Sequence, residues 1–92
     1  MIKGNPISRM FTVVSQYHNK KTNTHIKKFN YFFLSYQDAE EWIDWVISEK
    51  QKNWKLKVTT DETGARVAES KYLGCKWRYH VREIFDYNIR IA

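Results

Sequence analysis

One segment of this 92-residue chain has helical periodicity, and segments with the character of strands flank it on both sides. Ser35 ends an apolar run and is a favourable N-cap, and Asp38 stands in the first turn, where the helix dipole favours an acid. The sequence therefore predicts one helix over residues 36–50, with Trp45 off its main apolar face. That face is formed by Tyr36, Ala39, Trp42, Ile43, Val46 and Ile47.

The strand-like segments alternate apolar or aromatic residues with polar ones. A polar stretch over 19–24 separates the first two, which predicts an antiparallel hairpin. In the third, Trp54, Leu56 and Val58 are expected to face the core. Residues 84–91 are β-prone but contain an Asp-Tyr-Asn sequence, so they form either a separate strand or a bend. The segments are 10–18, 25–34, 54–60, 65–70 and 76 onward.

This order, β-β-α-β-β-β, predicts an α+β fold with a single helix packed on one face of a mostly antiparallel sheet. No repeat or composition change divides the chain, so we expect residues 1–92 to form a single domain. In a chain of this length we expect no deep, enclosed active-site cavity.

The location of the protein is predicted from what the sequence lacks. No apolar run approaches the roughly 20 residues that cross a bilayer, and residues 1–6 lack the apolar stretch of a secretory signal. A single cysteine, Cys75, suits a reducing compartment and is expected to be a small buried side chain. We therefore expect a cytoplasmic protein with no membrane contact.

Charge is unevenly distributed along the chain. The net charge is +6, yet five of the ten acids fall within residues 38–49, which contain no Lys or Arg. Glu40, Glu41 and Asp44 are expected to face water from the helix. The remaining residues carry 16 basic against five acidic side chains, so the body of the protein is strongly basic and favours an anionic partner.

A period of two in the last segment separates cations from core residues. Trp77, Tyr79 and Val81 point to one face, and the basic residues between them point to the other. Such a row attracts phosphates, and exposed rings such as Tyr31, Tyr72 and Tyr87 would stack on bases. Lys27 or Lys28 is expected to add to the row. The predicted nucleic-acid-binding or partner-binding residues are Lys55, Lys57, Lys76, Arg78, His80, Arg82, Lys20 and Lys21.

Other interpretations of these residues remain open. Lysines on a sheet face also serve solubility and prevent edge aggregation. His18 and His25 bracket the hairpin turn, but two histidines make no metal site, and we predict neither metal nor cofactor. Phosphate-loop, dinucleotide-binding, zinc-protease and thiol-redox motifs are absent, and acids along one helix face are usually only solvated. We therefore expect a binding protein and not an enzyme.

The chain resembles the small accessory proteins of large AT-rich bacteriophages. The likeness lies in its richness in Lys, Asn, Ile and Tyr, in the polar run 17–23, and in the strand-then-capped-helix run 31–42. It implies a protein that neutralises a host defence or redirects a host enzyme, by binding either RNA or protein. It assigns no individual residue.

Two functional hypotheses follow from these observations. The first is a nucleic-acid-binding regulator or inhibitor, with RNA ahead of DNA because exposed rings on a sheet suit unstacked bases. The alternative is an anti-defence inhibitor that binds an acidic surface of a host protein directly. The open edges of the sheet and the large supply of aromatic residues also favour a homodimer.

Overall fold

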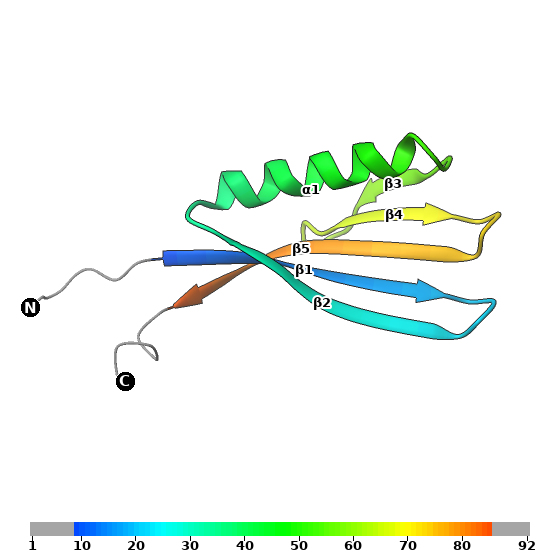
Figure 1. Ribbon diagram of the computed structural model, residues 1–92, viewed down its shortest axis with the longest axis horizontal. Coiled ribbons are helices and arrows are strands. Elements are labelled where there is room, and N and C mark those ends of the chain that lie inside the picture. The colour runs from blue at the N-terminus through cyan, green and yellow to red at the C-terminus, as the bar shows by residue number, and fades with distance from the viewer. Residues whose placement is uncertain (1–8, 86–92) are drawn as a thin grey trace, which may run out of the picture.

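A computed structural model describes residues 9–85, which form one helix and a five-stranded antiparallel sheet (Figure 1). The predicted order β-β-α-β-β-β is confirmed. Across the sheet the strands run β2-β1-β5-β4-β3, so the last long strand pairs with the first. The elements are β1 (Arg9–Asn19), β2 (Thr24–Phe33), α1 (Tyr36–Gln51), β3 (Lys57–Thr60), β4 (Arg66–Ser70) and β5 (Cys75–Phe85).

The predicted β1–β2 hairpin is confirmed, and it contains one irregularity. The register shifts between Thr12 and Val13, opposite Tyr31, whose φ of 47° is left-handed. The Thr12 hydroxyl donates to the carbonyl oxygens of Tyr31, at 2.7 Å, and of Asn30, at 3.0 Å, which holds the bulge. The Tyr31 ring consequently lies against the Trp42 ring of α1 in an edge-to-face contact.

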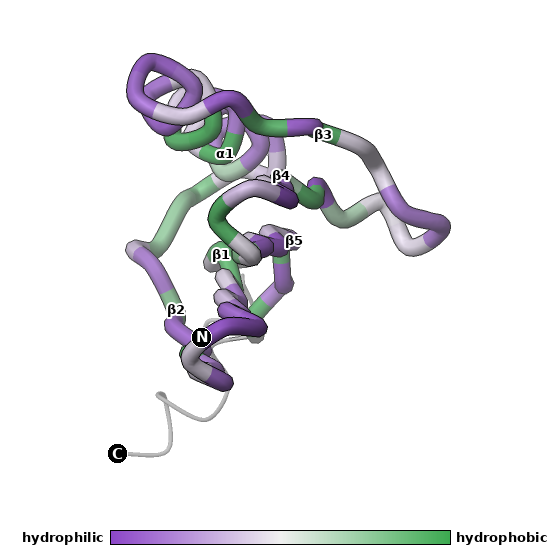
Figure 2. Tube along the Cα trace, turned by 90° about the vertical axis from the view of Figure 1, so that its right-hand side faces the viewer, coloured by the Kyte–Doolittle hydropathy of each residue, from purple (hydrophilic) through white to green (hydrophobic). Residues whose placement is uncertain are grey.

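Helix α1 begins where the capping residue predicts. The Ser35 hydroxyl accepts a hydrogen bond from the Asp38 backbone N–H at 3.0 Å, which satisfies one of the four free donors of the first turn. The helix lies along one face of the twisted sheet (Figure 2). Its buried residues belong to the predicted apolar face, and Trp45, expected off that face, is 58% exposed.

The core lies between α1 and the central strands of the sheet. Ala39, Ile43 and Ile47 of the helix pack on Phe11, Val13 and Tyr79, with Trp42 and Trp77 partly buried beside them. Burying a side chain such as Ile43 contributes about 1.5–3 kcal/mol. Burial also raises the pKa of the Tyr79 hydroxyl well above its ordinary range. The central strands β1 and β5 are therefore the rigid base on which both sheet faces depend.

Asp44 faces water as expected, but Glu40 is half-buried, and neither carboxylate is only solvated. Both carboxylates pair with the Arg66 guanidinium of β4, Asp44 at 2.6 Å. Arg66 stands in the same row as Tyr79, on the face that α1 covers, and a guanidinium can hold two carboxylates at once. These acids therefore hold the helix on β4, while Glu41 remains exposed.

The predicted third strand is shorter than expected. Residues 54–56 precede β3, and Trp54 and Val58 are 40% and 38% exposed, so their assignment to the core is wrong. The reason is the order of the strands: β3 lies at one edge of the sheet, whereas α1 packs on β1, β5 and β2, toward the opposite edge. Of the tail, β5 extends to Phe85; residues 86–92, where a separate strand or a bend was expected, lie outside the described residues.

Candidate functional site

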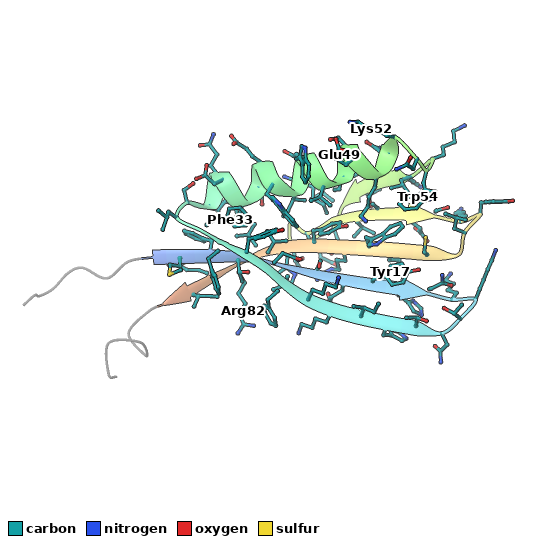
Figure 3. The ribbon with its side chains drawn as sticks, viewed as in Figure 1. Tyr17, Phe33, Glu49, Lys52, Trp54 and Arg82 are labelled. Carbon is teal, nitrogen blue, oxygen red and sulfur yellow. The ribbon has the colours of Figure 1, made fainter. Side chains whose placement is uncertain are left out.

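The sheet face opposite α1 carries the cations of β5, and we call it the open face. Directly paired residues of neighbouring strands share a face, so the register defines its composition. Lys76, Arg78, His80 and Arg82 of β5 lie on it, as the alternation predicts. Figure 3 shows Arg82 projecting from the side of the sheet away from α1. Its other members include Lys57 of β3, Glu69 of β4, Val14, Gln16 and His18 of β1, and His25, Lys27, Phe29 and Phe32 of β2.

An exposed aromatic ring lies between cations on the open face. Phe29 lies on the edge strand β2 and is paired with Val14, which in turn pairs with His80 of β5. Its side chain is 57% exposed. Lys27 Nζ lies 5.8 Å from the ring centroid and Arg82 Cζ lies 6.0 Å from it. Both cations are within reach of a cation–π interaction, and both are themselves exposed.

Arg78 is held by neighbouring groups and is only half-exposed. Its Nε donates to Asp61 at 3.0 Å, and its terminal nitrogens donate to Thr63, at 3.0 Å, and to Gln16, at 3.2 Å. Asp61 also accepts hydrogen bonds from Thr63 and Ala65, and these contacts, the Thr63 hydroxyl first, lower the pKa of its carboxyl to about 2. Arg78 therefore fixes the β3–β4 turn, with most of its donors already engaged.

At the Lys76 end of the open face, one row of paired residues contains both lysines and an acid. Glu69 stands between Lys57 and Lys76 in the register, so one carboxylate faces two exposed lysines. The same row continues through His18 to His25, whose rings stack with centroids 4.1 Å apart. This row therefore places one acid and two stacked imidazoles among the lysines at this end of the open face.

Two histidines of the open face, His80 and His18, have lowered pKa values. Burial lowers the pKa of His80, and Arg78, Lys27 and Arg82 lower it further, while Asp61 opposes them. For His18, partial burial and then His25 lower the pKa, with smaller effects of Lys20 and Lys76. Both imidazoles are therefore harder to protonate than a free histidine, because burial and, after it, neighbouring positive charge disfavour the charged form.

The remaining predicted binding residues lie away from the centre of this face. Lys55 is exposed but precedes β3, and Lys20 and Lys21 lie in the β1–β2 turn. Lys21 packs beside Gly74, and its ammonium group donates to the Tyr72 carbonyl oxygen at 2.9 Å. The four β5 residues and Lys57 thus lie on one face, whereas Lys21 links the β1–β2 turn to the β4–β5 turn.

The rings proposed from the sequence also lie elsewhere. Tyr31 packs against Trp42 on the helix side, Tyr72 is exposed in the β4–β5 turn, and Tyr87 lies outside the described residues. The sequence interpretation missed Phe29. Alternation could have found it, because Phe29 is in phase with Lys27 and out of phase with Lys28, which faces the helix side.

Within residues 9–85 no group of three His, Cys, Asp or Glu side chains could hold a metal ion. Cys75 is buried as predicted, and burial raises the pKa of its thiol, which disfavours the reactive thiolate. No described helix is long and apolar enough to cross a membrane. The chemistry on the open face is accordingly that of charge and ring stacking.

No family model, no curated protein and no solved structure matches this chain.

Proposed function

We propose that the open face binds single-stranded nucleic acid, RNA ahead of DNA, and that the protein acts through this binding as a regulator or inhibitor. The observation that carries the proposal is the exposed Phe29 ring between Lys27 and Arg82. Proteins that bind single strands combine such rings, on which bases stack, with cations that track the backbone. A surface whose lysines serve only solubility does not require an exposed Phe between two of its cations.

Each group on this face has a role in the proposed complex. One base stacks on Phe29, while Arg82 and Lys27 contact the flanking phosphates. Lys76 extends the path along β5, where alternate residues are about 6.6–7 Å apart, close to the phosphate spacing of an extended strand. Arg78 positions the β3–β4 turn, because its donors are held by Asp61, Thr63 and Gln16.

Fluorescence anisotropy with labelled single-stranded RNA, single-stranded DNA and duplex tests the proposal, measured at several salt concentrations. We expect the wild type to prefer the single strands. Phe29→Ala should weaken binding by about 1–3 kcal/mol, the range for one stacked base. Charge reversal of Lys27 and Arg82 together should abolish binding, and Arg82→Ala should lower the salt slope by about one phosphate contact.

Matched controls separate this surface from general charge and aromaticity. Trp45→Ala removes an exposed ring from the outer side of α1, and Lys52→Glu reverses an exposed lysine at its C-terminal end. Both should bind like the wild type. Unchanged affinity in Phe29→Ala would contradict stacking on this face. Failure to bind any nucleic acid near physiological salt would contradict the proposal and favour the acidic surface of a host protein as the partner.

A further inference from the structure

A cavity of about 650 Å³ opens on the other face of the sheet, between the C-terminal half of α1 and strands β2, β1 and β5. Its volume is within the range of small-molecule sites. Trp42, Val46 and Lys50 line it from the helix, and Tyr17, Lys28 and Trp77 line it from the sheet. Figure 3 marks Tyr17 and Trp54 on this side. The open face has no part in it, apart from Gln16 at the margin.

Flat aromatic surfaces dominate this cavity. Trp54 stacks on Trp77, with ring centroids 5.6 Å apart and planes 23° apart. The Tyr17 ring also contacts Trp77, with a centroid distance of 5.3 Å. Trp42 completes the aromatic wall, so three of the four tryptophans of the chain face one space. Trp54 is still 40% exposed, which leaves ring surface for a ligand. Stacked indoles of this kind suit a planar ring better than a flexible chain.

The charge of the cavity is entirely positive. Lys28 and Lys50 are lining residues, and the lining includes no Asp or Glu. Neither lysine forms an ion pair with a carboxylate in the described part of the chain. Lys50 Nζ lies 4.6 Å from the Trp77 ring centroid. Burial lowers the pKa of Lys50, opposed by Cys75, and Lys28 lowers it further, so an incoming anion would relieve an unfavourable environment.

Polar groups at the cavity floor add a means of orientation. Asn30 donates to the Ser15 hydroxyl at 2.8 Å and to the Val13 carbonyl oxygen at 3.3 Å, which fixes its side chain. Asn19 is likewise fixed by donating to the Tyr17 hydroxyl at 3.0 Å. Both asparagines line the cavity. Amide side chains held in place in this way can read the hydrogen-bonding edge of a heterocycle.

We propose that this cavity binds a planar aromatic anion of the nucleotide class, with its ring against Trp54 and Trp77 and its phosphate at Lys50 and Lys28. The site is separate from the open face and does not depend on the function proposed for that face. Lys28 and Lys50 repel a cation, and the indole surfaces disfavour a bare, strongly hydrated inorganic anion.

Isothermal titration calorimetry with AMP, adenosine, inorganic phosphate and dodecanoate tests the site. We expect AMP to bind, adenosine to bind about tenfold more weakly because it lacks the charge-assisted contacts, and phosphate alone to give no measurable heat. Dodecanoate, a flexible anion, should bind more weakly than AMP. Lys50→Gln should bring AMP down to the affinity of adenosine, while Lys52→Gln, next to it at the helix end but outside the cavity, should change nothing.

Two further results decide between this site and the open face. Trp54→Ala should weaken AMP and adenosine alike and leave oligonucleotide binding at the open face intact, whereas Phe29→Ala should leave AMP binding intact. The proposal is overturned if AMP gives no heat, if dodecanoate binds as tightly as AMP, or if Phe29→Ala and not Trp54→Ala removes AMP. Should Trp54→Ala fail to fold, the comparison of AMP with adenosine in Lys50→Gln decides, because that change removes the charge and leaves the tryptophans of the cavity in place.

Discussion

The two faces of the sheet are built from alternate residues of the same strands, yet they depend on different physics. On the covered face, Val13 and Tyr79 pack against α1 and lose almost all contact with water. On the open face, Val14 is equally buried, but no helix covers it; its paired neighbours Phe29 and His80 do. The covered face is thus a core shared between two layers, whereas the open face shields itself with long side chains.

The same difference governs the cations of the two faces. Arg78 on the open face meets Asp61 and polar partners, so its charge is compensated and its position is fixed. Lys50 on the covered face lies 4.6 Å from the Trp77 ring centroid but has no carboxylate partner in the described part of the chain, so only the indole rings compensate its charge. A cation without an anionic partner in a partly apolar space gains from a ligand that supplies the anion. The comparison therefore identifies the covered face as the place where a small anion gains most.

The largest expected effect is on stability, and it should separate the faces. Ile43→Ala removes a fully buried side chain from the covered face and should cost about 2–5 kcal/mol of unfolding free energy. Arg82→Ala on the open face should stay within about 0.5 kcal/mol, as exposed substitutions do. Urea denaturation followed by circular dichroism measures both, with Trp45→Ala as the exposed control on the same helix. Equal losses for Ile43→Ala and Arg82→Ala would contradict the division.

A smaller loss is expected at the helix start, and it sharpens the location of the cavity. Ser35→Ala removes the hydroxyl that accepts from the Asp38 backbone N–H and should cost about 1 kcal/mol. The cavity lies at the other end of α1, near Trp42 and Lys50. Thermal melts should therefore register the loss while AMP titrations remain unchanged. A loss of AMP affinity in Ser35→Ala would place the ligand site nearer the N-terminus of the helix.

Local chemistry made much of the fold predictable. The Ser35 cap and the apolar spacing after it located α1, and period-two alternation assigned Trp77, Arg78 and their neighbours in β5 to the correct faces. These signals are local, since each depends on residues two to four positions apart. The same alternation extends to β2, where it places Lys27 on the open face and Lys28 in the cavity.

The order of the strands in the sheet could not be predicted from local sequence patterns, and it determines which residues are buried and which meet. The pairing of β5 with β1 leaves β3 outermost, so Trp54 and Val58 are half-exposed although their alternation resembles that of a core strand. The same order brings Arg66 under the acids of α1, 22 and 26 positions earlier in the chain. The cavity needs Trp42, Trp54 and Trp77 from three separate segments, and no local spacing predicts that they meet.

The smallest expected effect concerns pH and the open face. In the free protein, burial and the neighbours Arg78, Lys27 and Arg82 hold the pKa of His80 below its ordinary 6.5, so the ring is neutral at pH 7.5. Bound phosphates would raise that pKa, so binding takes up a proton and affinity should increase as the pH falls from 7.5 to 5.5. We expect about a twofold gain, because exposed charge pairs contribute only about 0.2–1 kcal/mol. Asp61, with a pKa of about 2, stays ionised throughout this range.

Anisotropy titrations of wild type and His80→Asn at both pH values measure this gain. His80→Asn should bind with little pH dependence, and His18→Asn, whose ring lies two rows away beside His25 and Lys76, should keep most of it. If instead His18→Asn removes the dependence and His80→Asn does not, the phosphates lie at the Lys76 end of the face. Binding that weakens as the pH falls would contradict an anionic ligand beside His80, since protonation there adds only positive charge.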